Sequence, residues 1–518
     1  MIPSLRLAKV RSVIDQGSSW YKWAYALASG AISALGLAPF DLWFVALVGL
    51  SAAFYLFLTA KSTRQATLIG WGFGSGYFAV GLNWIVEPFA VDAARYLWMA
   101  PFAMVFMSTG LALFWAAAFW GARSLAKNDT PVVRVLVLAL CLTIAELARS
   151  YVLTGFPWAL VSQIWVQTNV IQMISTVGPH GLTLLTLIAV GSSVAAFFIK
   201  GWLPRSASLI PAAALVASGL FWTNEVPETQ SDAPVVRLVQ PNAAQRDKWN
   251  PAKIPIFFRR QVEFTREPTQ NGGRPDLIVW PETAVPTLLD YADEAFGVIT
   301  EAAQGSPVVV GIQRRSGYRL FNSMVTLNSQ GEVAGIYDKS HLVPFGEYIP
   351  FGSFLGQFGL RGLAAEDGDG FSAGPGPVLL DLGPVGRALP LICYEAIFPQ
   401  DVNRAPERPD FLLQITNDAW FGKFSGPYQH LAQARMRAIE QGLPMMRAAN
   451  TGVSAMIDAR GNITAQLGLD QAGFVDASLP AKLRPTIYSR SGDIPISLVL
   501  ALGLFGVLAR KLNARSNK

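Results

Sequence analysis

The chain has 518 residues, of which 52% are hydrophobic and only 15% are charged, and its mean hydropathy is +0.34. Soluble globular proteins carry about 25% charged residues, so this composition indicates a membrane protein. The 15 Trp and 31 Phe exclude a disordered chain. The two cysteines, Cys141 and Cys393, are too few for a disulfide framework. The net charge of +6 would suit a nucleic-acid-binding protein only if the basic residues were gathered in one domain.

Eight apolar stretches approach the roughly 20 residues that a helix needs to cross a bilayer. We predict that all eight are membrane spans; the first, seventh and eighth are short, and the alternative for each is an interfacial or buried helix. The stretches run from Ala24 to Ala38, Leu42 to Ala60, Ala66 to Ile85, Leu97 to Gly121, Val132 to Leu153, Gly181 to Ile199, Ser208 to Trp222 and Ile496 to Ala509.

Lysine and arginine are concentrated in every second connection between these stretches, beginning with the segment before the first and ending with the tail after the eighth. Basic residues remain on the cytoplasmic side of a membrane. Both termini are therefore predicted to be cytoplasmic, and the long segment after the seventh stretch lies on the other side of the bacterial inner membrane, in the periplasm. The cytoplasmic segments hold 15 Lys and Arg against two acidic residues, a net charge of +13, which leaves −7 for the rest of the chain. The outer domain is therefore acidic, which excludes a nucleic-acid partner.

We predict three parts: a membrane domain of seven helices at 1–222, an extramembrane domain at 223–493, and a last transmembrane helix with a basic tail at 494–518. In the extramembrane part, short apolar runs alternate with amphipathic helical patterns such as Ala292 to Ala303 and His430 to Gln441, which indicates a layered α/β domain. The predicted strands are Val235–Val239, Leu277–Trp280, Val308–Ile312, Met324–Leu327, Val333–Tyr337, Val378–Leu382, Leu389–Ile392, Phe411–Ile415 and Ser454–Ile457.

Two charged residues, Glu146 and Arg149, stand three positions apart near the outer end of the fifth apolar stretch. Charges inside a membrane mark a functional site by default, and the alternative is a structural ion pair at the interface. We interpret Trp158, in the turn that follows, as part of an interfacial aromatic belt.

Cys393 follows the apolar run Leu389 to Ile392 directly, which places its thiol at the end of a buried strand. A thiol at such a turn can hold an acyl group while the N–H of Tyr394 stabilises a tetrahedral oxyanion. The alternative is an inert cysteine in the core.

Glu282 and Lys339 each follow another predicted strand. Glu282 is a candidate general base, and an ammonium such as Lys339 would lower the pKa of a nearby thiol and stabilise an oxyanion. Alone, each would more simply be a solvated charge. Glu282, Lys339 and Cys393 come in this order, 57 and then 54 residues apart, each just after an apolar strand.

These residues carry a family resemblance. The segments Trp280-Pro281-Glu282, Lys339 and Cys393-Tyr394-Glu395 resemble the Glu, Lys, Cys triad of the nitrilase superfamily, whose fold is an αββα sandwich. The segments YDKSHLVPFGEYIP at 337–350, NDAWFG at 417–422 and LTGFPW at 153–158 are similar to the apolipoprotein N-acyltransferase family, which combines this domain with an eight-helix membrane bundle. The resemblance covers essentially the whole chain.

The resemblance implies that Cys393 takes an acyl chain from a phospholipid, typically phosphatidylethanolamine, and passes it from a thioester to the α-amine of a diacylglyceryl lipoprotein. Membrane lipids are therefore expected partners, and no cofactor is implied. Glu282 would be the base, Lys339 the oxyanion partner and Glu347 a further site carboxylate, with Tyr394 beside the nucleophile. The implied substrate-binding residues are Trp249, Glu395 and Trp420, and Gln240 and Asn242 lie on the same predicted loop as Trp249 near the membrane.

Three alternatives remain open from the residues. Cys393, His430 and Asn450 have the chain order of a papain-like protease but lack the local sequence of that family. A membrane-tethered amidase would use the same triad with water as acceptor, and a transporter or scaffold would leave the thiol dispensable. A metal site is unsupported, because the three histidines are scattered.

The apolar segment from Phe351 to Leu360, with Trp249, is expected to form a lipid-facing lip at the active site.

Overall fold

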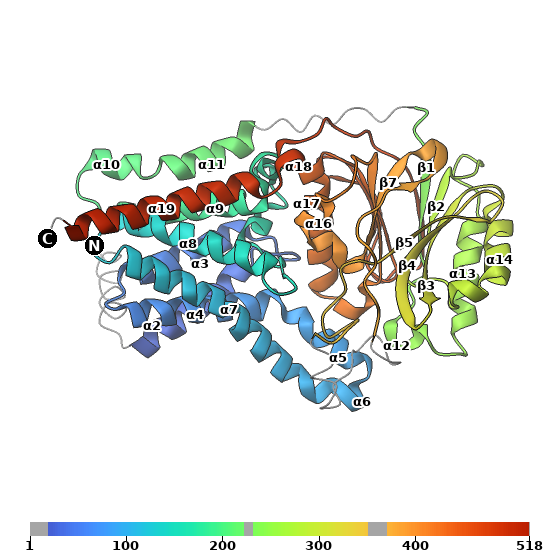
Figure 1. Ribbon diagram of the computed structural model, residues 1–518, viewed down its shortest axis with the longest axis horizontal. Coiled ribbons are helices and arrows are strands. Elements are labelled where there is room, and N and C mark those ends of the chain that lie inside the picture. The colour runs from blue at the N-terminus through green and yellow to red at the C-terminus, as the bar shows by residue number, and fades with distance from the viewer. Residues whose placement is uncertain (1–18, 222–230, 351–369, 517–518) are drawn as a thin grey trace, which may run out of the picture. The chain divides into compact units, whose positions relative to one another are not determined.

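A computed structural model describes residues 19–221, 231–350 and 370–516 of the chain. These residues form two compact units (Figure 1). The first comprises the described parts of Met1–Val86, Trp98–Thr223 and Asp493–Lys518, and the second comprises those of Glu87–Leu97 and Asn224–Gly492. The predicted lip segment from Phe351 to Leu360 lies outside the described residues.

The first unit is a helical bundle, and each predicted apolar stretch coincides with one of its helices. These are α2 (Ser19–Ala34), α3 (Trp43–Leu58), α4 (Thr63–Gly81), α7 (Ala100–Leu125), α8 (Pro131–Tyr151), α9 (Ile174–Ala195), α11 (Ile210–Phe221) and α19 (Ile494–Ser516), with the short α10 (Trp202–Ala207) before α11.

Five helical segments of the described chain are long and apolar enough to cross a membrane, and they include α7, α8, α9, α11 and α19. Helix α3 is apolar but shorter. The predicted total of eight spans therefore stays a prediction, although several membrane-spanning helices are present.

Helices α2 and α4 pack backbone against backbone through glycine. A Cβ atom on Gly76 would lie 1.9 Å from the carbonyl oxygen of Leu27, and one on Gly30 would lie 1.9 Å from that of Phe73. Small residues allow such close approach between membrane helices, where van der Waals contact drives association. The glycines of α4 are thus required by the packing of the bundle.

The ion pair predicted between Glu146 and Arg149 is buried and holds the loop that follows α8. Arg149 Nη2 lies 3.9 Å from Glu146 Oε1, and Arg149 Nη1 donates to the carbonyls of Phe156, at 2.5 Å, and Trp158, at 2.7 Å. The N–H of Val161 donates to Glu146 Oε1 at 3.1 Å. This geometry fits the structural alternative. The assignment of Trp158 to an aromatic belt was wrong, because its side chain is fully buried.

The second unit contains two six-stranded sheets. In chain order the strands are β1 (Val235–Gln240), β2 (Leu277–Val279), β3 (Val308–Ser316), β4 (Arg319–Leu327), β5 (Val333–Asp338), β6 (Leu380–Asp381), β7 (Arg387–Ile392), β8 (Phe411–Thr416), β9 (Met445–Ala449), β10 (Ser454–Ile457), β11 (Ile463–Leu467) and β12 (Gly473–Ser478). One sheet has the order β12-β1-β2-β3-β4-β5 and the other β11-β10-β9-β8-β7-β6.

Each sheet is built around three parallel strands, β1, β2 and β3 in one and β7, β8 and β9 in the other, with antiparallel strands on both sides. Strand β5 is antiparallel to β4, which is antiparallel to β3, so β5 runs in the same direction as β2. The carboxyl ends of β2 and β5 therefore lie at the same edge of their sheet.

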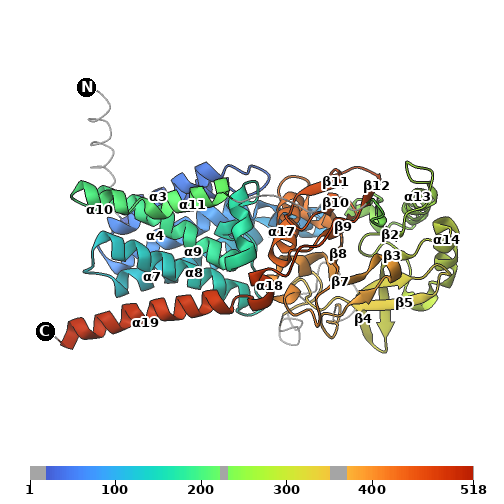
Figure 2. The ribbon, with the colours of Figure 1, turned by 90° about the horizontal axis from the view of Figure 1, so that it is seen from above.

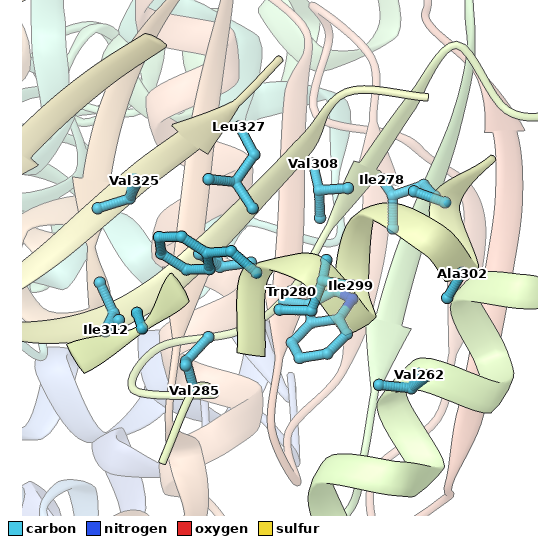
Figure 3. Packing of buried hydrophobic residues seen from close by; sticks show 14 of the residues in the cluster. Val262, Ile278, Trp280, Val285, Ile299, Ala302, Val308, Ile312, Val325 and Leu327 are labelled. Carbon is cyan, nitrogen blue, oxygen red and sulfur yellow. The ribbon is translucent and has the colours of Figure 1, made fainter. Parts of the chain in front are cut away.

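Helices cover the outer face of each sheet, which gives the expected αββα layers (Figure 2). Helices α13 (Ile254–Arg266) and α14 (Asp293–Ala303) cover the first sheet, and α17 (Gly426–Gln441) covers the second. In the first core, Trp280, Ile299 and Val308 belong to one buried cluster (Figure 3). The remaining short helices are α5 (Glu87–Val91), α6 (Ala93–Tyr96), α12 (Gln245–Lys248), α16 (Pro399–Val402) and α18 (Ile487–Ser491).

The glycine packing of the bundle gives a stability prediction. Gly76→Ala places a methyl group against the main chain of α2, and overpacking of this kind costs about 1–3 kcal/mol. The thermal unfolding temperature of the purified full-length protein in detergent is expected to fall. Gly110→Ala is the matched control, because a Cβ there meets nothing within 4 Å. Equal unfolding temperatures for the two variants would contradict the close packing of α2 and α4.

Candidate active site

Glu282, Lys339 and Cys393 follow the carboxyl ends of β2, β5 and β7, as their positions in the sequence predict. The edges of the two sheets meet at this point, because the N–H of Asn417, which follows β8, donates to Glu282 Oε2 at 2.8 Å. The charges of Glu282 and Lys339 both act on the Cys393 thiol. The fold therefore brings the three predicted residues together from both sheets.

Two carboxylates share the ammonium of Lys339. Lys339 Nζ lies 2.8 Å from Glu347 Oε1 and 3.6 Å from Glu282 Oε1, and its side chain is buried. Asn322 Nδ2 donates to Glu282 Oε1 at 2.6 Å and to Glu347 Oε1 at 3.3 Å. Burial alone would lower the pKa of Lys339, but the two carboxylates outweigh it and raise that pKa above its ordinary value. The two carboxylates therefore favour the charged form of Lys339.

The main chain at Glu282 passes very close to β3. A Cβ atom on Gly311 would lie 2.4 Å from the carbonyl oxygen of Pro281 and 2.7 Å from the Cα of Glu282. The carbonyl of Gly311 also accepts the N–H groups of Ala284, at 2.8 Å, and Val285, at 3.1 Å. A glycine at this position fixes where Glu282 emerges from the sheet.

Cys393 is buried and has a left-handed backbone conformation, with φ at 52°. Such a conformation in a residue other than glycine is strained, and strain of this kind clusters at active sites. Burial and the Glu282 carboxylate raise the pKa of the thiol, and the Lys339 ammonium opposes them without prevailing. Lys339 lowers the thiol pKa as expected, but burial and Glu282 have the larger effect. A thiol that stays protonated needs a base to become a nucleophile.

Glu395 forms a buried clamp beside the nucleophile. Its Oε1 accepts bonds from Tyr337 OH at 2.6 Å, Ser340 N at 2.7 Å and His341 N at 3.1 Å. Its Oε2 accepts the N–H of Ile392 at 2.7 Å. Burial raises the pKa of this carboxyl above its ordinary value. Because both oxygens are used within the protein, Glu395 ties the end of β5 to the turn at Cys393, and its substrate-binding role stays a prediction.

The other predicted residues surround this centre. Glu347 is fixed by the N–H of Val343, which donates to its Oε2 at 2.8 Å. The ring of Tyr394 is buried and lies edge-on to Phe398, with centroids 5.0 Å apart. Trp249 is 43% exposed, and Trp420 is half-buried. These two indoles are the accessible members of the predicted set.

Gln240 and Asn242 have structural roles. Gln240 Nε2 donates to the carbonyls of Gly468, at 2.7 Å, and Gln471, at 2.8 Å. Asn242 Nδ2 donates to the carbonyl of Asp470 at 2.7 Å. Both side chains join the first sheet to the loop before β12.

Two further residues of the site, Lys248 and Asn322, were not predicted from the sequence. Lys248 Nζ donates to the Glu282 carbonyl at 3.0 Å and to Thr283 Oγ1 at 2.6 Å. Burial lowers its pKa to about 8, against the opposing effect of Glu282 and Cys393. Lys248 also lines a cavity beside Glu282 with Trp249 and other largely apolar side chains. A lysine next to a tryptophan in a polar loop and an asparagine within an apolar strand were the available signals.

The papain-like alternative is not supported. His430 Nε2 lies 3.1 Å from the carbonyl oxygen of Cys393, and its Nδ1 lies 2.9 Å from Asp418 Oδ1. Asn450 Nδ2 donates to the carbonyl of Ala243 at 2.7 Å. Both ring nitrogens of His430 face oxygen atoms, so His430 is not placed as the base of a thiol. Over the described ranges, no group of three or more His, Cys, Asp or Glu side chains is arranged to hold a metal ion.

Comparison with known proteins matches two family descriptions along the chain. Residues 236–488 match "Carbon-nitrogen hydrolase", and residues 29–192 match "Apolipoprotein N-acyltransferase N-terminal domain". The chain is 38% identical to the apolipoprotein N-acyltransferase of Rhodopseudomonas palustris, over 98% of each chain. It is 39% identical to that of Bradyrhizobium diazoefficiens, over 98% of this chain and 99% of the relative. It is 36% identical to that of Caulobacter vibrioides, over 95% of each.

The Glu395 clamp gives a prediction that separates positioning from substrate contact. Glu395→Ala leaves several buried donors without an acceptor, and each such group costs about 1–3 kcal/mol. The thermal unfolding temperature is expected to fall clearly in the absence of any substrate. Glu301→Ala, at a side chain that is 80% exposed, is the control and should change little. If Glu395→Ala kept the parental unfolding temperature and only weakened substrate binding, the positioning role would be contradicted and the predicted substrate-binding role supported.

Proposed function

The chain belongs to the apolipoprotein N-acyltransferase family, and we propose that it transfers a fatty acyl chain from a phospholipid to the amino-terminal diacylglyceryl-cysteine of lipoproteins. The protein is a membrane protein with several long apolar helices and an acyltransferase with a carbon-nitrogen hydrolase domain. The observation that carries the proposal is the meeting of Glu282, Lys339 and Cys393 at the joined edges of the two sheets.

In the first half-reaction, Glu282 takes the proton of the Cys393 thiol, and the sulfur attacks the ester carbonyl of the phospholipid. Lys339 Nζ and the N–H of Tyr394 stabilise the oxyanion that develops on that carbonyl oxygen. When the ester C–O bond breaks, Glu282 returns the proton to the departing alkoxide. The products are a thioester on Cys393 and a lysophospholipid.

In the second half-reaction, the α-amine of the lipoprotein attacks the thioester carbonyl and Glu282 accepts a proton from the nitrogen. The C–S bond breaks, and the sulfur regains a proton from Glu282 as the amide is released. Glu347 holds Lys339 in place throughout, through the 2.8 Å contact between Glu347 Oε1 and Lys339 Nζ. One base thus serves both half-reactions in opposite directions.

We infer that the acyl donor is phosphatidylethanolamine, whose headgroup carries a protonated amine. A long acyl chain needs an apolar path to the thiol, and the cavity beside Glu282 is lined by Trp249, Ile254 and Phe257. The amidase alternative has the same thioester chemistry, but a small soluble amide would need neither the apolar helices nor this lining. The proposed location is the bacterial inner membrane, with the catalytic domain in the periplasm and both termini in the cytoplasm.

The nucleophile is tested by exchanging each cysteine in turn. Cys393→Ser is expected to abolish acyl transfer from labelled phospholipid to a diacylglyceryl peptide, because a neutral hydroxyl is a far weaker nucleophile than a thiolate. Cys141→Ser, in α8, is the matched control and should keep the parental rate. Near-parental transfer by Cys393→Ser, or its loss in Cys141→Ser, would contradict the proposal.

The membrane orientation is tested without reference to chemistry. In a Cys141→Ser background, an impermeant thiol reagent applied to whole cells should label Tyr318→Cys, a fully exposed position of the catalytic domain. The same reagent should leave Lys61→Cys and Lys127→Cys unlabelled until the cells are opened, although both positions are exposed. Labelling of the lysine positions in intact cells would overturn the periplasmic orientation.

A further inference from the structure

A buried group of polar side chains, which we call the carbonyl cradle, lies behind the nucleophile and has no part in the chemistry above. The cradle consists of Gln414 on β8, Asp418 after it, His430 on α17 and Arg447 on β9. All four side chains are fully buried. A buried ion pair such as that of Asp418 and Arg447 seldom stabilises a fold more than apolar side chains of the same volume would, so stability alone does not explain these residues.

The cradle converges on one atom, the carbonyl oxygen of Cys393. Gln414 Nε2 donates to this oxygen at 3.1 Å, and His430 Nε2 lies 3.1 Å from both the oxygen and Gln414 Nε2, so that it holds the amide and the carbonyl together. Each side chain also has a partner for its other polar atom: Arg447 Nη1 donates to Gln414 Oε1 at 2.5 Å, and Asp418 Oδ1 lies 2.9 Å from His430 Nδ1.

Asp418 anchors the cradle as a permanent anion. Arg447 Nη2 donates to Asp418 Oδ2 at 2.5 Å, and Thr416 Oγ1 donates to Asp418 Oδ1 at 2.9 Å. Burial alone would raise the pKa of Asp418, but Arg447 and His430 outweigh it and lower that pKa to about 2. The orientation of the His430 ring is therefore fixed between a carboxylate and the Cys393 carbonyl.

The consequence follows from the geometry of the peptide bond. A peptide unit is planar and trans, so the C=O of Cys393 and the N–H of Tyr394 point in opposite directions. A carbonyl held in the cradle turns the Tyr394 N–H away from the cradle. A flipped unit would instead present a carbonyl oxygen to the developing negative charge. The left-handed φ of Cys393 at 52° makes this unit one that the surroundings must hold in place.

We propose that Gln414 and His430, supported by Asp418 and Arg447, are positioning residues that lock the Cys393–Tyr394 peptide with its N–H directed at the reacting carbonyl group. The inference rests on the proposed function, since it assigns the Tyr394 N–H its role at the oxyanion. It adds four residues that take no part in the proton transfers above. They act on the oxyanion through the Cys393–Tyr394 peptide, and the charge of Asp418 also raises the pKa of the thiol, a charge that both His430 variants keep.

The test measures two reactions of the same thiol in the full-length enzyme with Cys141→Ser. Alkylation of Cys393 by iodoacetamide needs the sulfur and its base but forms no oxyanion. Acyl-enzyme formation from labelled phosphatidylethanolamine in detergent needs the sulfur and its base and also a stabilised oxyanion. His430→Asn keeps an amide facing Asp418 but withdraws the group at the Cys393 carbonyl. It is expected to slow acylation by about 10²–10³, the effect of losing an oxyanion donor, with alkylation little changed.

His430→Gln is the matched variant, because the amide of its longer side chain can take the place of Nε2 beside Gln414 and the Cys393 carbonyl, and it should recover most of the acylation rate. Glu282→Gln is the control in which alkylation and acylation fall together. The proposal is wrong if His430→Asn acylates at the parental rate, if it slows both reactions equally, or if both His430 variants lose the folded state. Failure of the proposed function is distinguishable, since the parent with its cradle intact would then form no acyl-enzyme.

Discussion

The active site depends on a lysine that two carboxylates keep charged inside the protein. Lys339 lies within 3.6 Å of both Glu347 and Glu282, so each acid stabilises the cation that stabilises the other. The thiol in the same site is driven the opposite way, since burial and Glu282 raise the pKa of Cys393. The raised pKa favours the protonated thiol at rest, which is why the proposed mechanism needs Glu282 as its base.

Much of the fold followed from patterns that are local in the sequence. The runs before Glu282 and Cys393 predicted β2 and β7, because an apolar run ended by a turn is a strong signal of a buried strand. The helix expected at His430 to Gln441 begins slightly earlier, in α17. The apolar stretches predicted the helices of the first unit, because the length and apolarity of a segment can be read from the sequence without knowledge of tertiary contacts. The three catalytic candidates were found because each directly follows a strand.

What the sequence could not reveal depends on contacts between distant segments. Strands β9, β11 and β12 were missed because their apolar residues are interrupted by polar ones, such as Arg447, that are buried only in the folded sheet. Asn322 joins two carboxylates only once β4 lies beside them. The neighbours of Glu395 in the sequence suggest a substrate-binding acid, yet one oxygen accepts the N–H of Ser340 after β5 and the other accepts the N–H of Ile392 in β7. Partners of this kind are set by tertiary structure alone.

The account rests on a covalent acyl group at one sulfur, and peptide mass mapping measures it most directly. The purified full-length protein would be incubated with phosphatidylethanolamine, digested and compared with and without hydroxylamine, which cleaves thioesters. We expect a fatty-acyl mass on the peptide that contains Cys393, removed by hydroxylamine and depleted when a diacylglyceryl peptide acceptor is added. An acyl group on Cys141, one that resists hydroxylamine, or one that persists with the acceptor present would contradict the account.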